Sequence, residues 1–488
     1  MNPGRREYSD QPAIRSVTRC SIILFAVGLA GCVRFESQPI SPANNATQLD
    51  ARRLDDAGLK KFLERNLAHD LESWPLKTWD FKRLTLAAFY FNPSLDVARA
   101  QWSATQAGVR TAGGRPNPTL NLTPGYDFSA ANGVSPWIPF FSVDVPVETA
   151  GKRARRIAKA SHLSDSSRLN IATLAWQVRR NVRTSLLDFT VAGHRAAVLE
   201  QQMRVQEQIV SLLEQRLAVG AISQPELTAA RIALNKTRLD LSGARSRQAE
   251  ARARLAESLG VSTSALEGAE LSFDFADHSA DGLTSAEARR VALQGRSDIL
   301  SALGEYAAAE AELRLQIAKQ YPDVHLSPGY QYDQGDNKWT LGIVLELPVF
   351  NQNQGPIAEA KARRDEAAAR FTEVQAKVIG EIDRAGAAYH VAREQLTTTD
   401  ALFAAAQQQQ QSAEAQLRAG ATDPLDRMTA EFELGVAALA RLDVRTAMQQ
   451  SIGALEDALQ RPVESKERTA STASLLNTVQ NPPERSAK

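Results

Sequence analysis

The sequence has little cysteine, few aromatic residues and almost no net charge. Its 488 residues contain two cysteines, Cys20 and Cys32, both near the N-terminus, which excludes a disulfide framework for the bulk of the chain. The formal net charge of +1 leaves no overall field that would attract nucleic acid. Aromatic residues make up only 6% of the chain, and alanine and glutamine dominate long stretches. This composition favours helices over a compact mixed core.

Motifs for catalysis and for metal binding are absent from the sequence. It contains no zinc-ligand spacing of histidine and cysteine, no phosphate-binding glycine loop and no nucleophile motif. A lone histidine on a long polar helix is usually solvated rather than a ligand. We therefore predict no enzyme activity, no cofactor, no catalytic residue and no metal site. The six histidines are widely scattered: His69, His162, His194, His278, His325 and His390.

The N-terminus has the pattern of a secretory signal. Residues 15–19 include two arginines, and residues 21–29 form a short apolar core. Leu29-Ala30-Gly31-Cys32 follows and resembles the cleavage box of bacterial lipoproteins. A membrane-anchoring helix is the alternative, but this core is too short to span a bilayer comfortably. We predict cleavage before Cys32, which would become the acylated first residue.

Strict alternation of apolar and polar residues marks two neighbouring stretches. Apolar side chains take alternate positions in residues 324–332 and 339–349, on either side of the turn-rich segment 333–337. This is the signature of a β-hairpin. Each arm has about the ten residues that a tilted strand needs to cross a bilayer, and aromatic residues lie near its ends. A soluble hairpin packed on helices is the alternative, and we favour the membrane hairpin.

The same hairpin occurs earlier in the chain. Pro118–Tyr126 aligns without a gap with Pro322–Tyr330. The preceding helical segment repeats too, because a constant shift of 204 residues places Pro93 on Ser297. The chain is therefore a duplication, and each half contains a helix followed by a hairpin.

A very long helical segment follows each hairpin. Small and apolar residues keep three-to-four spacing from about Ala150 to Val219. A helix of that span is roughly 100 Å long. Helices of this length persist only where neighbouring helices bury the apolar stripe. We therefore expect the long helices to pack against one another.

Two similar turns end the first long helix of each half. Gly220 and Gly420 suit the left-handed position after a helix. Ser223-Gln-Pro-Glu226 then forms a capping box, and Asp423 and Asp426 take the same places in the second half. Helix capping alone explains these residue types. Any further role for them has to come from other observations.

Taken together, these motifs resemble the TolC-like family of trimeric outer-membrane efflux channels. The resemblance covers nearly the whole chain after Cys32. It rests on the duplicated strands, on Val145–Arg153 and Leu347–Ile357, and on the two Leu-x-x-Gly turns. The Gly151-Lys-Arg and Phe350-Asn-x-Asn signatures are most similar to the heavy-metal (cobalt–zinc–cadmium) resistance branch of that family.

The resemblance implies a mainly α fold with a membrane β part. Duplicated helix/hairpin halves would assemble as a homotrimer, with a 12-stranded β-barrel in the outer membrane continued by a 12-helix α-barrel into the periplasm. Residues 53–91, 266–296 and 461 onward would form a mixed equatorial region. The chain would be lipid-anchored in the outer membrane. A periplasmic adaptor (membrane fusion) protein would couple it to an inner-membrane RND-type pump.

The implied function is a passive exit duct, with divalent heavy-metal cations as the expected cargo. The tips around Gly220 and Gly420 would meet the adaptor, and Glu226, Asp423 and Asp426 would lie at the periplasmic aperture. Asp426 either gates that aperture or only caps its helix. Alternative functions are the outer channel of drug efflux, the outer channel of type I protein secretion, and a structural envelope lipoprotein.

These observations divide the sequence into segments of different character. The predicted segments are a lipoprotein signal peptide (1–31), a lipidated tether (32–52), a first structural repeat (53–264) with a strand hairpin (118–147) and a long helical hairpin (150–260), an equatorial linker (265–282), a second structural repeat (283–461) with a strand hairpin (322–349) and a long helical hairpin (355–460), and a disordered tail (462–488).

Overall fold

The computed structural model describes residues 34–274, 280–463 and 472–480. Contacts divide the chain into two units, residues 1–50 and residues 51–488. In the first unit the described residues contain the helix α2 (Pro42–Asp50). Across the described ranges, no helix combines the length and the apolar character that a membrane span requires.

The helix α2 lies within the segment predicted as a lipidated tether (32–52), for which the sequence indicated no helix. The backbone N–H of Asn44 donates to Ser41 Oγ at 3.4 Å, and Pro42 occupies the first helical position. Serine before a helix and proline at its first position are helix-start signals. Composition alone missed them, because the segment carries no apolar periodicity.

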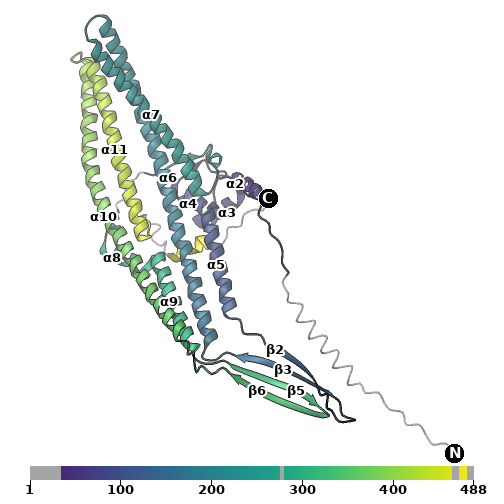
Figure 1. Cartoon of the computed structure of the whole chain (residues 1–488). Helices are drawn as coiled ribbons and strands as arrows, with labels where there is room; N and C mark the ends of the chain where they lie inside the picture. Colours follow the sequence, from purple (N-terminus) through teal and green to yellow (C-terminus); the bar gives the residue numbers. More distant parts are fainter. Residues whose placement is uncertain (1–33, 275–279, 464–471, 481–488) are drawn as a thin grey trace, which may run out of the picture. The chain divides into compact units, whose positions relative to one another are not determined.

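In the second unit, one order of elements occurs twice (Figure 1). Helix, hairpin and two long helices follow one another in each half, as the sequence predicts. The elements of the first half are α3 (Ala57–Leu67), β1 (Thr78–Trp79), α4 (Phe81–Phe91), α5 (Pro93–Ala112), β2 (Thr119–Tyr126), β3 (Trp137–Val147), α6 (Lys152–Ala218) and α7 (Gln224–Leu259). Those that follow are β4 (Glu270–Leu271), α8 (Ala286–Gly295), α9 (Ser297–Ala318), β5 (Val324–Asp333), β6 (Asp336–Leu345), α10 (Gln354–Arg418), α11 (Pro424–Leu459) and α12 (Thr472–Val479).

The long helices pack side by side along much of their length. Close contacts join α6 to α7, α10 to α11, and α6 to α9 and α11. The helix predicted from about 150 to 219 is α6, with 67 residues, and α10 has 65. Because each begins at a hairpin and ends at a tight turn, the sheet and the two turns lie at opposite ends of the helices (Figure 1).

The two hairpins join into one four-stranded antiparallel sheet in the order β2-β3-β5-β6. Both predicted hairpins are present, but β6 ends at Leu345 rather than at residue 349. Pro348 has no N–H to donate to a strand ladder, and the N–H of Val349 donates to the carbonyl of Leu347 at 2.8 Å. This local turn replaces the last two alternating positions of the predicted strand.

Part of the segment predicted as a disordered tail over residues 462–488 is helical, and residues 464–471 and 481–488 lie outside the described residues. Residues 472–479 form α12, in which Leu476 and Val479 are buried in the core near the start of α5. Nε of the buried Arg99 donates to the carbonyl of Val479 at 2.7 Å. Leu475, Leu476 and Val479 alone did not predict a helix in this otherwise polar segment. They are fully or partly buried because they pack against α5 and α6.

A buried ion cluster fastens the end of α11 to α6. The carboxylate of Glu456 accepts hydrogen bonds from Arg179 at 2.8 Å and Arg183 at 2.5 Å. Gly453 leaves room for Arg183, because a Cβ there would lie 2.8 Å from its Nε. Burial opposes ionisation, but the two arginines hold the pKa of Glu456 below its usual value. Losing one partner of such a buried pair is strongly destabilising.

Asp457 has the opposite electrostatic character. Its side chain is 12% exposed and one oxygen lies 3.0 Å from Arg180 Nε. Burial raises its pKa to about 6, although the charge of Arg180 opposes the shift. The folded protein therefore holds this proton more tightly than the unfolded chain does. The ionised carboxylate lowers stability above pH 6, and this loss is relieved as the pH falls through 6.

We predict that Asp457→Asn stabilises the protein at pH 7.5 and leaves its stability nearly unchanged at pH 4. The asparagine removes the buried charge, a gain of at most about 3 kcal/mol. Thermal unfolding of both proteins across this pH range measures the difference. Asp443→Asn, which changes a half-exposed aspartate on the same helix, is the control. A stabilisation that does not depend on pH would contradict the assignment.

Candidate membrane sheet and helical tips

The four-stranded sheet has one apolar and one polar face. Its register places Leu122 opposite Phe141, Phe141 opposite Tyr330, and Tyr330 opposite Trp339. Side chains two residues apart on a strand share a face, so the apolar positions of all four strands form one surface. That surface consists of Leu120, Leu122, Tyr126, Trp137, Phe141, Val143, Val145, Val147, Val324, Leu326, Tyr330, Tyr332, Trp339, Leu341, Ile343 and Leu345.

Much of this apolar face is exposed in the chain. Trp339 is 78% exposed, Leu122 69% and Leu341 67%. Soluble monomeric proteins rarely leave so large a contiguous apolar surface in water. The strands of membrane barrels carry such a face towards lipid.

Aromatic side chains lie at both ends of the sheet. Near the hairpin turns, ring centroids lie 5.0 Å apart for Tyr126 and Trp137 and 5.0 Å apart for Tyr330 and Trp339. At the helical end, Tyr321 is 60% exposed and Phe350 fully exposed. Aromatic residues at two levels match the two interfaces of a bilayer.

The opposite face is mainly polar, although Ile138, Phe140 and Val344 also lie on it. It contains a cluster that sequence reasoning missed. Asp144 accepts a hydrogen bond from Ser327 Oγ at 2.9 Å, and its other oxygen lies 2.9 Å from His325 Nδ1. The alternation of side chains along β3 and β5 places these three residues on one face. Their contact depends on the pairing of β3 with β5, which no local pattern reveals.

The start of α6 fastens the sheet to the helices. Lys152 Nζ lies 2.7 Å from Asp323, just before β5, and Arg156 forms an ion pair with Glu148, just after β3. Arg153 Nε donates to the carbonyl of Gly113 at 2.7 Å, at the end of α5. The Gly151-Lys-Arg signature is therefore a structural junction between strand ends and helix ends.

The corresponding signature before α10 is also structural. Asn353 has a φ of 62° where Gly151 has 68°, and its side-chain amide donates to the carbonyl of Gln316 at 2.7 Å. Asparagine tolerates this left-handed conformation better than most residues. Within the described residues, no group of three or more His, Cys, Asp or Glu side chains is arranged to hold a metal ion.

The two helical tips have the capped geometry that the sequence predicts. Gly220 has a φ of 69° and Gly420 of 73°. The backbone N–H of Ser223 donates to Glu226 Oε1 at 3.3 Å, and its hydroxyl donates to the same oxygen at 2.6 Å. Asp426 Oδ2 accepts from the N–H of Asp423 at 3.3 Å. Each acid at the third helical position therefore caps its own helix.

The tips contact each other through a residue that the sequence did not single out. Arg216, near the end of α6, lies 2.5 Å from both carboxylate oxygens of Asp423. The hydrogen bond from Arg216 is the main cause of a lowered pKa of Asp423, and the hydrogen bond from the backbone N–H of Leu425 is the second. In the described part of the chain Asp426 forms no ion pair, so its charge is not neutralised by a neighbouring cation. Cys32 and its cleavage box Leu29-Ala30-Gly31 lie outside the described residues.

Comparison with protein families identifies the chain. The family model "Outer membrane efflux protein" matches residues 88–261 and 288–460, one match in each half. The chain belongs to the outer membrane efflux protein family. This confirms the predicted family, and a family of efflux proteins agrees with the prediction of transport rather than catalysis.

Two curated relatives of this efflux protein have different printed roles. The cobalt-zinc-cadmium resistance protein CzcC of Cupriavidus metallidurans is 25% identical over 282 residues, which cover 57% of this chain and 64% of CzcC. The pyoverdine export outer membrane protein OpmQ of Pseudomonas aeruginosa is 24% identical over 338 residues, covering 64% of this chain and 69% of OpmQ. The chain thus spans just under two thirds of CzcC.

The fold of this efflux protein is that of solved outer-membrane channels. The CmeC outer membrane channel of Campylobacter jejuni superposes with a TM-score of 0.65 at 16% identity, covering 100% of this chain and 98% of CmeC. The prediction of a mainly helical, channel-like fold is confirmed at this level. The closed barrel and the trimer stay predictions.

We predict that Asp423→Ala loosens both tips, whereas Asp423→Asn loosens only their connection. Asparagine caps a helix as well as aspartate does, but it cannot pair with Arg216 as an anion. Hydrogen exchange over residues 210–230 and 415–430 reports the local opening. With asparagine, the first turn of α11 should stay protected; with alanine, it should exchange faster. Equal exchange in the two variants would contradict a capping role.

Proposed function

We propose that this protein is the outer-membrane channel subunit of a tripartite efflux system. The exposed apolar face of the β2-β3-β5-β6 sheet carries this proposal, because it has spanning length, aromatic ends and a polar opposite face. Membership of the efflux family supports it. The polar face would line the passage, and the apolar face would contact lipid.

The sheet edges require a closed assembly. Within the described chain, β2 and β6 each have one unpaired edge, and hydrocarbon does not tolerate open sheet edges. Two copies would give eight strands, whose interior is filled by side chains. Three copies give twelve strands and leave a lumen. We therefore propose a homotrimer with a 12-stranded β-barrel, continued by a barrel of twelve helices from α6, α7, α10 and α11.

The chain is proposed to act as a passive duct. No catalytic motif occurs in its sequence, so the energy for export would come from an inner-membrane RND-type pump. A periplasmic adaptor protein would bridge the two at the tips around Gly220 and Gly420. Glu226 and Asp426 would lie near the aperture, where three like charges repel unless cations bind.

Conductance tests the duct directly. The purified trimer should give steady ion conductance in planar bilayers, and divalent cations on the periplasmic side should block it. Asp426→Asn should weaken the block, and Glu226→Gln is the matched comparison at the other tip. An absence of conductance would favour a structural envelope lipoprotein. Block that is unchanged in Asp426→Asn would leave that residue as a helix cap only.

The proposed cargo is divalent heavy-metal cations. The similarity to CzcC supports this choice, whereas the similarity to OpmQ favours export of other molecules. The signature residues Gly151, Lys152 and Asn353 lie where strands join helices. Their structural role there means that they do not indicate the cargo. The remaining alternative for cargo is a protein passed by a type I secretion system.

We predict that deletion of the gene lowers tolerance to zinc, cobalt, cadmium or nickel. Loss of the outer channel would leave the pump without an exit from the periplasm. Growth across a metal series, with the intact gene restored as a control, measures the effect. Unchanged metal tolerance together with lowered drug or detergent tolerance would contradict the metal assignment.

We propose that Cys32 carries the lipid anchor. Leu29-Ala30-Gly31 precedes it, and no other cysteine follows it in the sequence. Val33 is not the aspartate that is associated with inner-membrane retention in enterobacteria, so we expect sorting to the outer membrane. Mass spectrometry of the mature N-terminus should find diacylglycerol and an acyl chain on Cys32. An unmodified Cys32, or cleavage at another position, would contradict the anchor.

A further inference from the structure

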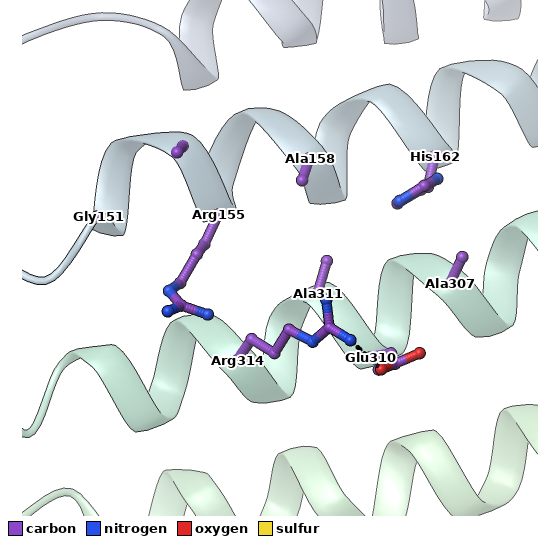
Figure 2. Close-up of a pocket in the computed structure, with 9 residues that line it drawn as sticks. Gly151, Arg155, Ala158, His162, Ala307, Glu310, Ala311 and Arg314 are labelled. Atoms are coloured by element: carbon purple, nitrogen blue, oxygen red, sulfur yellow. Dashed lines mark hydrogen bonds and ion pairs between the residues drawn. The ribbon is translucent and has the colours of Figure 1, made fainter.

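A groove of about 310 Å³ lies between the beginning of α6 and the end of α9 (Figure 2). Its floor is formed by alanines, and its polar groups come from both helices. The lining residues are Gly151, Ala154, Arg155, Ala158, His162, Ala307, Glu310, Ala311 and Arg314. No role described above uses this groove.

The groove carries more positive than negative charge. Arg314 pairs with Glu310 one turn away, at 2.5 Å. Arg155 reaches from α6 towards α9, as Figure 2 shows, and donates to the carbonyl of Ala150 at 3.4 Å. No acidic partner of Arg155 occurs among the described residues, so the groove contains two guanidinium groups and one carboxylate. An anion would complement this arrangement.

The groove lies close to the ends of the strands. Gly151 is only four residues beyond the last residue of β3, and Arg155 lies in the first turn of α6. On α9, the exposed side chain of Ile317 lies one turn beyond Arg314, towards the strands. An apolar side chain beside a basic one is typical of a membrane–water interface.

The groove and Lys152 occupy different positions around α6. Lys152 reaches Asp323, which has the parity of His325 and therefore belongs to the polar face. Arg155, Ala158 and His162 lie roughly 60 to 120° around the α6 axis from Lys152. The groove therefore opens on a different side of α6 from the side chain that reaches Asp323.

The groove also lies away from the edges where copies of the chain would join. α6 packs between α5 and α9, and α9 packs between α6 and α10. The sheet edges that need partners are β2 and β6, which connect to α5 and α10. A neighbouring copy at either edge leaves the groove between α6 and α9 uncovered.

We propose that this groove binds the phosphate of an anionic phospholipid in the periplasmic leaflet of the outer membrane. The inference rests on the proposed placement of the sheet in that membrane. Arg155 and Arg314 bind the phosphate oxygens, and the alanine floor leaves room for the glycerol. Ile317, and Tyr321 beyond the end of α9, contact the first part of the acyl chains. The lipid thus fixes the depth of the sheet in the bilayer.

Lipid titration of the purified full-length protein in detergent tests the proposal. Native mass spectrometry with phosphatidylglycerol should find binding that falls about tenfold or more in the Arg155→Ala/Arg314→Ala variant. The control Arg254→Ala/Arg370→Ala removes the same charge from two exposed pairs elsewhere, and it should bind as the wild type does. Ala158→Leu fills the groove without changing charge, and it should also weaken binding.

Three results would overturn the proposal. These are unchanged affinity in the groove variants, an equal loss in the control, and displacement of the lipid by inorganic phosphate at the same concentration, which would indicate a free-phosphate site. Conductance is measured separately. A wild-type protein that binds lipid but conducts no ions would contradict the duct and leave the lipid site standing.

Discussion

The exposed apolar face of the four-stranded sheet determines the surroundings that this fold requires. Its side chains need a lipid environment, and its two open edges need partners. The proposed closed ring of several copies in the outer membrane would meet both needs. In that proposed assembly, the long helices that follow each hairpin would continue the ring. Such an assembly requires a junction without a hinge between the sheet and the helices.

The start of α6 provides that rigid junction. Cations at a helix N-terminus are unfavourable next to the helix dipole. Here the loss is offset, because Lys152 and Arg156 pair with acids beside the strands and Arg153 binds a carbonyl at the end of α5. The residues that resemble the metal-resistance signature therefore join the strands to the helices within the chain.

Local patterns predicted the parts of the fold that repeat or alternate. The alternation of apolar and polar residues predicted the strands. A glycine, followed by an acid at the third position of the next helix, predicted both tips. Contacts between distant segments could not be read in this way. The Arg216–Asp423 bond, the Asp144–His325 pair and the docking of α12 each depend on how elements pack. The polar composition of residues 34–50 and 472–480 gave no indication of a helix. In the first segment Ser41-Pro42 starts α2, and in the second a short apolar stripe docks α12.

Single-cysteine spin labels along β6 distinguish a membrane-spanning sheet from one in water. Labels replacing Leu341 and Ile343 should collide with oxygen dissolved in lipid, and labels replacing Thr340 and Gly342 with a water-soluble nickel chelate. Vesicles containing the assembled protein are the sample, and Val436→Cys on α11 is the water-exposed control. The account predicts accessibility that alternates with period two. Uniform access to the chelate at all four positions would contradict a membrane-spanning sheet.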